Sequence, residues 1–262
     1  MPQIKLNEIK INYKDKGQGF PVILIHGLSD DLNLWEPLIP ELTRYYRVIA
    51  LDLRGHGNSS KPDIPYSIND FSRDVYTLLV NLNIKKAHFM GLSMGGALAQ
   101  QFTVDHPGMV QSMILISSFT YLDSNSAETL LMLRESLIKG GFKLFFDEML
   151  PLVLTSDFIR EYESELLDIR AEKIETEYVP SIIHSIDACL EFNLKNQISA
   201  ISKPTLIISG KEDVLIPLEL QEQTHRLIKD STWEIIGNTG HNVIIPQNIP
   251  YLSKTILEFL KK

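Results

Sequence analysis

The serine at position 93 stands between two glycines in the stretch Gly91-Leu92-Ser93-Met94-Gly95. An apolar segment typical of a buried strand precedes it, and a segment with helical spacing follows it. A serine on so sharp a turn projects its hydroxyl over the end of a sheet, beside free backbone N–H groups at the start of the helix. A glycine-rich turn without a chemical role is the alternative, but the strand–turn–helix context favours a nucleophile.

A serine hydroxyl is a weak nucleophile until a base removes its proton, so the chain must also supply a histidine and a carboxylate that orients it. His241 is the best candidate among the seven histidines, because it follows the last predicted strand in the turn GNTGHN, where a loop can carry it over the sheet. The other histidines lie in predicted strands, helices or bracing turns: His26, His56, His88, His106, His184 and His225.

The carboxylate predicted to orient His241 is Asp213, which follows the preceding strand in SGKEDVLIP and so lies at the same end of the sheet. The chain order Ser93, Asp213, His241 fits a nucleophile on this type of turn. Two other acids remain possible. Glu212, as the immediate neighbour, should point away from wherever Asp213 points, and Asp123 follows another strand end.

Attack on an acyl carbonyl creates an oxyanion, which two backbone N–H donors typically stabilise by several kcal/mol. One predicted donor is Met94, the residue after the nucleophile. The other is Leu28, directly after the His26-Gly27 pair that ends an apolar run. Because the main chain supplies both hydrogens, the side chains at these positions are immaterial to the donation. This chemistry needs no cofactor and no metal ion, and we expect neither.

These residues would be held by a sheet whose strands alternate with helices. Two alternating runs, QIKLN and EIKINYK, predict an initial antiparallel pair because no helix fits between them. Apolar runs predict strands covered on both faces at 21–27, 46–57, 85–90, 110–118, 203–210 and 231–238, and helical spacing predicts helices at 32–45, 66–83 (capped by Ser67), 93–106, 218–230 and 249–262. The pattern predicts an α/β fold with a mostly parallel sheet of about eight strands.

The alternation of predicted strands and helices stops after residue 119. The pattern of 125–193 predicts several amphipathic helices without a buried strand. We predict a core made of 1–118 and 201–262 and a helical insertion at 119–200. This insertion holds 15 acidic and 7 basic residues against 18 of each elsewhere, so the whole net charge of −8 lies in it. If these acids surround the entrance to a site, polyanionic substrates such as acyl-CoA should be disfavoured.

The composition, 44% hydrophobic and 22% charged, is that of a globular protein with a sizeable core. The first ten residues include charged side chains and lack the apolar core of a signal peptide. No apolar run approaches the roughly 18 residues of a membrane span. The single cysteine, Cys189, is expected to be a buried thiol and excludes a disulfide framework. We therefore expect a cytoplasmic protein without membrane or nucleic-acid partners, since the chain lacks a basic face.

Five stretches together carry a resemblance: HG at 26–27, DLRGHGNS at 52–59, GLSMGG at 91–96, PTLIISGKEDVLIP at 204–217 and GH at 240–241. With them the chain resembles the α/β-hydrolases of the serine esterase and enol-lactonase type, and in pattern it is nearest to 3-oxoadipate enol-lactonase.

The resemblance implies that Ser93, Asp213 and His241 form a catalytic triad and that the insertion is a cap over the site. It also implies that Asp52 and Arg54 brace loops rather than contact substrate.

Some relatives are excluded by residue type. Dehalogenases and most epoxide hydrolases of this fold carry aspartate where this chain has Ser93, and HGLSD stands in place of the HGGG loop of many lipases. The expected function is a serine hydrolase that cleaves a small carboxylic ester or lactone through an acyl-enzyme. A thioesterase, a carbon–carbon bond hydrolase and a cofactor-free perhydrolase remain alternatives on the same triad, as does a non-enzymatic small-molecule receptor. The substrate itself and the oligomeric state stay open.

Overall fold

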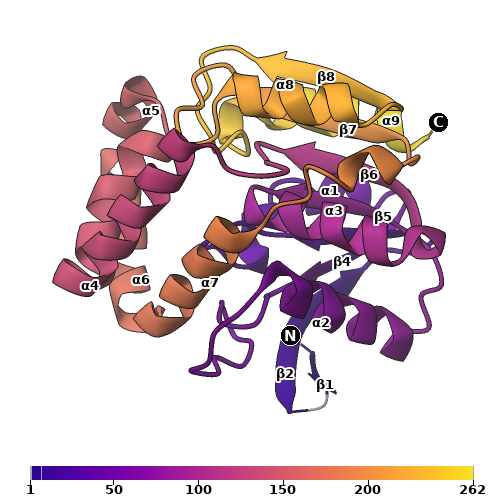
Figure 1. Cartoon of the computed structure of the whole chain (residues 1–262), viewed down its shortest axis with the longest axis horizontal. Coiled ribbons are helices and arrows are strands. Elements are labelled where there is room, and N and C mark those ends of the chain that lie inside the picture. Colours follow the sequence, from indigo (N-terminus) through magenta and orange to yellow (C-terminus); the bar gives the residue numbers. More distant parts are fainter. Residues whose placement is uncertain (1, 7, 262) are drawn as a thin grey trace.

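The computed structural model describes residues 2–6 and 8–261, which form a mostly parallel sheet with helices on both faces (Figure 1). In this part of the chain the sheet has eight strands in the order β1-β2-β4-β3-β5-β6-β7-β8. Their bounds are β1 (Gln3–Leu6), β2 (Ile9–Lys16), β3 (Pro21–Ile25), β4 (Arg47–Leu51), β5 (Ala87–Leu92), β6 (Val110–Ile116), β7 (Thr205–Gly210) and β8 (Ser231–Ile236). The predicted fold class is confirmed.

The strand directions place the carboxyl ends of the central strands side by side. β1 and β2 form the predicted antiparallel pair, and β2 is also antiparallel to β4. From β4 to β8 every neighbouring pair is parallel. Ile25 at the end of β3 is level with Leu51 of β4 and Gly91 of β5. The loops that follow these strands therefore emerge at one edge of the sheet.

The core has two parts, one on each face of the sheet, because strand side chains alternate in direction. In β3, Ile23 and Ile25 pack on the face covered by α2 (Ile68–Asn81), α3 (Met94–Asp105) and α8 (Leu218–Leu227). Val22 and Leu24 pack on the other face, against α9 (Ile249–Leu260). Both faces are buried, which explains why these strands read as continuous apolar runs.

Helix α2 begins where the sequence predicts. The Ser67 side chain accepts a hydrogen bond from the Asp70 N–H, and the Asp70 carboxylate accepts one from the Ser67 N–H at 2.9 Å. This reciprocal capping satisfies two N–H groups that the helix itself cannot pair.

The single helix predicted at 32–45 is wrong. The segment forms a 3₁₀ helix, η1 (Leu32–Trp35), and a four-residue helix, α1 (Ile39–Leu42). Pro37 and Pro40 explain the break, because proline has no N–H for the helical ladder and is tolerated only in a first turn. Pro40 occupies such a first turn in α1.

Between β6 and β7 the chain forms α4 (Ser124–Val153), α5 (Ser156–Glu161), α6 (Glu163–Thr176) and α7 (Val179–Glu191). Figure 1 shows these helices grouped at one end of the sheet. Helix α4 is kinked at Gly141, whose φ is 63°. The division into a core and a cap at 119–200 stays a prediction. None of the helices in the described ranges combines the length and apolar character needed to cross a membrane.

Candidate active site

Ser93 occupies a strained turn between β5 and α3. Its φ is 52° and its ψ is −117°, a conformation that a residue with a side chain rarely adopts. The surrounding chain holds it there: the Ser93 N–H donates to Ile116 O at 2.8 Å, and the Ser118 hydroxyl donates to Ser93 O at 2.8 Å. The strain is therefore balanced by fixed contacts to the neighbouring strand and its loop.

The glycines on either side of Ser93 are required by close backbone approach. A methyl group on Gly91 would lie 2.3 Å from the Gly95 carbonyl oxygen, and one on Gly95 would lie 2.2 Å from Ile25 O. Such distances are well inside van der Waals contact, so a side chain at either position would push α3 away from the sheet. The spacing of small residues in the sequence reflects this packing.

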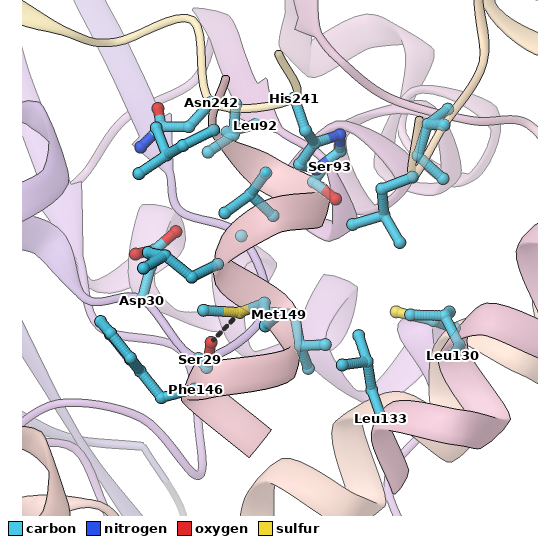
Figure 2. Close-up of a pocket in the computed structure, with 18 of the residues that line it drawn as sticks. Ser29, Asp30, Leu92, Ser93, Leu130, Leu133, Phe146, Met149, His241 and Asn242 are labelled. Atoms are coloured by element: carbon cyan, nitrogen blue, oxygen red, sulfur yellow. Dashed lines mark hydrogen bonds between the residues drawn. The ribbon is translucent and has the colours of Figure 1, made fainter. Parts of the chain in front are cut away.

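His241 and Asp213 are in direct contact. His241 Nδ1 lies 2.9 Å from Asp213 Oδ2 and 3.1 Å from Oδ1, and both side chains are buried. Asp213 is fixed by the Ile216 N–H, which donates to Oδ1 at 2.9 Å, and by Gln221 Nε2, which donates to Oδ2 at 3.1 Å. With Nδ1–H donated to this carboxylate, Nε2 of a neutral His241 ring is an acceptor. Figure 2 shows the Ser93 hydroxyl beside this ring.

The structure places the two rival acids elsewhere. The Glu212 carboxylate accepts a hydrogen bond from the Thr239 N–H at 2.7 Å, so it holds the loop that carries the histidine, whereas the His241 ring is hydrogen-bonded to Asp213. Asp123 caps α4 by accepting from the Ser126 N–H at 2.8 Å. Only Asp213, of the three acids considered from the sequence, meets His241.

The two proposed oxyanion donors come from the predicted segments. Met94 is the first residue of α3, where a backbone N–H has no intrahelical partner. Leu28 lies in the loop after β3 and lines the same pocket as Ser93. Within the described residues neither N–H donates to a protein acceptor.

Ser93 and His241 open into an apolar cavity of about 210 Å³. Its wall opposite the sheet is built by the inserted helices: Leu130, Leu133, Phe146 and Met149 from α4, Ile169 from α6 and Cys189 from α7. Cys189 is buried as predicted, and burial raises the pKa of its thiol to about 12. A neutral thiol packs there as a small apolar group.

Three polar residues of the pocket were missed from the sequence: Ser29, Asp30 and Asn242. Desolvation raises the pKa of the Asp30 carboxyl to about 6. Asn242 directly follows His241, and its Oδ1 accepts from the Ile244 N–H at 3.1 Å. Their only sequence signal is their position in HGLSD and GHN, one or two residues after Leu28 or directly after His241.

The histidines of the bracing turns make loop contacts, as expected. His26 donates from Nδ1 to Gly27 O at 2.8 Å and accepts from the Leu53 N–H at Nε2. Burial lowers the pKa of His26 to about 4 and that of His56 to about 3. Both rings are neutral at pH 7. His26 joins the loops after β3 and β4, and His56 donates from Nδ1 to Arg54 O at 3.0 Å within its own loop.

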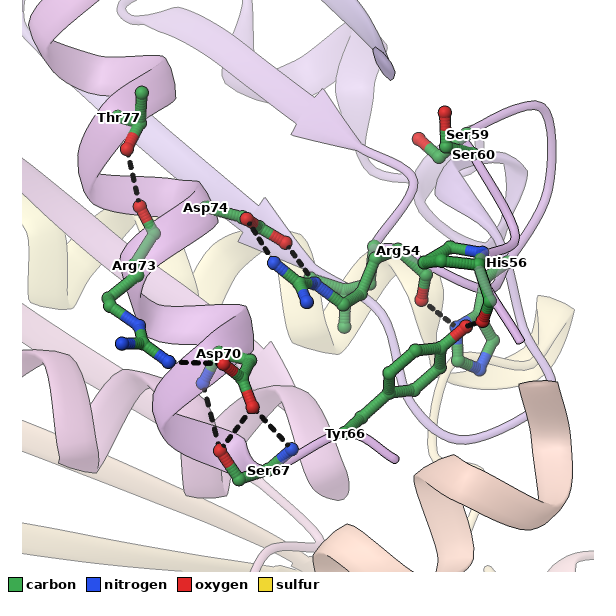
Figure 3. Close-up of polar contacts among 12 residues, drawn as sticks. Arg54, His56, Ser59, Ser60, Tyr66, Ser67, Asp70, Arg73, Asp74 and Thr77 are labelled. Atoms are coloured by element: carbon green, nitrogen blue, oxygen red, sulfur yellow. Dashed lines mark hydrogen bonds and ion pairs between the residues drawn. The ribbon is translucent and has the colours of Figure 1, made fainter. Parts of the chain in front are cut away.

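The DLRGHGNS stretch also braces loops. Asp52 accepts hydrogen bonds from the Leu32 and Asn58 N–H groups, each at 2.8 Å. Arg54 forms two hydrogen bonds with Asp74 of α2, at 2.6 and 2.7 Å, which Figure 3 shows beside the capped start of that helix. Neither Asp52 nor Arg54 lines the pocket around Ser93. In the described part of the chain, no group of three or more His, Cys, Asp or Glu side chains is arranged to hold a metal ion.

Comparison with known proteins agrees with this architecture. The family described as alpha/beta hydrolase fold matches residues 21–247. The chain is 29% identical over 257 residues to AB hydrolase superfamily protein YisY of Bacillus subtilis, covering 91% of each chain. It is 28% identical to the 2-hydroxy-6-oxo-6-(2'-aminophenyl)hexa-2,4-dienoic acid hydrolase of Metapseudomonas resinovorans, covering 97% of this chain and 88% of that one.

Among solved structures, the enol-lactonase from Burkholderia xenovorans superposes with a TM-score of 0.93 at 25% identity, over 100% of both chains. This agrees with the predicted resemblance to the enol-lactonase type. These matches identify the chain as a member of the α/β hydrolase fold family and support hydrolase activity.

Proposed function

We propose that the protein is a serine hydrolase that cleaves a small carboxylic ester or lactone through an acyl-enzyme. The observation that carries this proposal is the arrangement of a strained serine beside a histidine whose other ring nitrogen is held by a buried carboxylate. This arrangement activates a hydroxyl for attack on an acyl carbon.

In the proposed mechanism Ser93 Oγ attacks the carbonyl carbon while His241 Nε2 takes the hydroxyl proton. The carbonyl oxygen becomes an oxyanion, which the N–H groups of Leu28 and Met94 stabilise. The tetrahedral intermediate collapses, and His241 gives the proton to the leaving alkoxide, so an acyl-enzyme and an alcohol result. Water then repeats the sequence with His241 as base, which releases the acid and restores Ser93. Asp213 keeps the ring oriented and stabilises the imidazolium.

The shape and polarity of the pocket support a small and largely apolar substrate. The cavity encloses about 210 Å³, and leucine, isoleucine, phenylalanine and methionine side chains make up most of its wall. Burying an apolar acyl chain there gives binding energy, while the few polar groups lie near the reacting bond.

The relatives named above include both an enol-lactonase and a dienoic acid hydrolase, so the fold alone does not choose the scissile bond. We therefore propose a panel of p-nitrophenyl acetate and butyrate, simple lactones and acyl thioesters, compared by kcat/KM for the parent and for Ser93→Ala. The expected result is multiple turnover of esters or lactones by the parent, and a loss of more than about 100-fold in the variant.

The substitution should leave the fold intact, since the Ser93 hydroxyl faces the pocket. Thermal unfolding is the control. A Ser93→Ala variant that kept more than about a hundredth of the parental rate would contradict the proposed nucleophile. A single burst without turnover in the parent would favour the receptor alternative, and thioesters far ahead of esters would favour the thioesterase.

A further inference from the structure

Asp30 supplies the one carboxylate among the described residues that line the pocket, and no lysine or arginine of these residues lines it. It follows β3 in the same loop as the proposed oxyanion donor Leu28. A methyl group placed on Gly27 would lie 3.5 Å from Asp30 Oδ2 and 3.5 Å from Ser93 Cβ. The carboxyl and the nucleophile therefore border the same small space.

The Asp30 carboxyl has no hydrogen-bond donor among the described protein residues. Desolvation raises its pKa to about 6, so at neutral pH it is mainly ionised. A carboxylate in a pocket without a protein hydrogen-bond donor has lost hydration that no protein group replaces. A ligand that donates a hydrogen bond to this carboxylate therefore binds more tightly.

Lys173 of α6 lies near Asp30 but is bound to other groups. Its Nζ donates to Glu177 Oε1 at 3.0 Å, and to Asp31 Oδ2 and Ser29 O at 3.3 Å each. The Lys173 ammonium is thus the one cation near three carboxylates, those of Asp30, Asp31 and Glu177. These four side chains together carry a net negative charge. The remaining titratable group near Asp30 is His241, which is neutral when it acts as a base.

The opposite ends of the pocket differ in polarity. Figure 2 shows Asp30 and Asn242 on one side and Leu130 and Leu133 on the other. Because Asn242 Oδ1 already accepts from the Ile244 N–H, its amide N–H₂ is what it can offer a ligand. This side therefore presents a charged acceptor and a neutral donor.

We propose that Asp30 selects the substrate class; this proposal rests on the proposed ester or lactone hydrolase activity. The site takes esters or lactones that carry a hydroxyl or ammonium group on the part that reaches the Asp30 side, and it rejects those that carry a carboxylate there. Attraction of the donor and repulsion of the second anion act together, as specificity commonly requires.

The test compares kcat/KM for four ethyl esters that differ only at the far end of the acyl chain: ethyl hexanoate, ethyl 6-hydroxyhexanoate, ethyl 6-aminohexanoate and monoethyl adipate. A second set places the same end groups on the alcohol side of a butyrate ester. In one of the two sets the parent should prefer the ammonium ester over the carboxylate ester by roughly tenfold or more. In Asp30→Asn this preference should fall to within about threefold.

Glu172→Gln is the matched control, since it removes one negative charge from an exposed site on α6 outside the pocket. It should keep both the parental preference and the parental turnover of ethyl hexanoate. If Asp30→Asn does not fold, the parent alone still tests the proposal. Its preference for the ammonium ester over ethyl hexanoate should decline as the pH falls from 8 to 5, because Asp30 becomes protonated.

Equal preferences in the parent and Asp30→Asn, or a parental ratio independent of pH in both ester sets, would overturn the role of Asp30 and leave the hydrolase standing. Failure of the proposed function looks different. In that case the parent would turn over ethyl hexanoate no faster than Ser93→Ala, and both proposals would fall.

Discussion

The imidazole of His241 and the carboxylate of Asp213 meet at 2.9 Å between Nδ1 and Oδ2, although they follow different strands and are 28 residues apart in the chain. Both are buried, and Asp213 is held by two backbone N–H groups and by Gln221. The carboxylate is thus fixed before it orients the ring, which is what a general base on this site requires.

Replacement of this carboxylate should be far more harmful than replacement of its neighbour. Asp213→Asn should lower kcat by about 10³–10⁴, because the amide can stabilise the wrong ring tautomer and cannot stabilise the imidazolium. Glu212→Gln is the control, since its remaining amide oxygen can still accept from the Thr239 N–H, and its rate should stay within about threefold of the parent. Measuring kcat of both variants on one ester shows which acid orients His241. An essential Glu212 with a dispensable Asp213 would give that role to Glu212.

The turn around Ser93 should not tolerate a side chain on Gly95. A methyl group there would lie 2.2 Å from Ile25 O and 2.5 Å from His26 O, so α3 must shift and carry Ser93 with it. Gly95→Ala should lower the free energy of unfolding by about 2 kcal/mol or more. Gly108→Ala is the matched control, because a methyl group there meets nothing within 4 Å. Equal melting temperatures for the two variants would show that the close approach is not limiting.

Much of this turn could be predicted from the sequence because it is local. The glycine spacing, the apolar strand and the helix all lie between 87 and 105, and the same holds for the Ser67 cap of α2. The pocket wall could not be predicted in this way, since its surface joins the loop after β3 to side chains of α4, α6 and α7. Asp30 was missed for that reason: the helices that close the pocket over its loop are distant in sequence. The helix expected at 32–45 failed because apolar periodicity was given more weight than two prolines.

Lys173 should matter to stability because its partner Glu177 is almost fully buried. The side chain of Glu177 is 3% exposed and that of Lys173 is 19% exposed. Burial opposes protonation of Lys173, but the carboxylates of Glu177 and Asp31 outweigh it and raise its pKa. Lys173→Met leaves the buried carboxylate unpaired and should cost about 3 kcal/mol of unfolding free energy.

Two further variants control for this effect. Lys139→Met breaks the exposed pair with Glu135 and should cost less than about 0.5 kcal/mol. The double variant Lys173→Met with Glu177→Gln should be more stable than Lys173→Met alone, because the buried side chain at position 177 no longer carries a charge without a cation. Denaturant unfolding measures all three, and a double variant less stable than the single one would contradict a specific ion pair.

Acid should destabilise the fold through its buried neutral histidines. Burial lowers the pKa values of His26 and His88 to about 4 and that of His56 to about 3, from an unfolded value of 6.5. Between those values the unfolded chain binds protons that the folded chain does not, so this stability is complete above pH 6.5 and is lost as the pH falls toward 4. Asp30, whose pKa burial raises to about 6, and Asp74, whose pKa burial also raises, act in the opposite direction, but they are two groups against three.

The melting temperature should therefore fall by several degrees between pH 7.5 and pH 4.5. Thermal unfolding at constant ionic strength measures this directly. A melting temperature that stays level or rises over that interval would mean that these histidines are not held neutral.

The most direct test of the account is the mass of the intact protein after reaction with p-nitrophenyl butyrate and rapid quenching in acid. The proposed acyl-enzyme mechanism predicts one added butyryl group, located on the peptide that contains Ser93, formed within one turnover and lost on hydrolysis. The Ser93→Ala variant should show no adduct. A parent that hydrolyses the ester without any acyl group on Ser93, or an equal adduct in Ser93→Ala, would contradict nucleophilic catalysis by this serine.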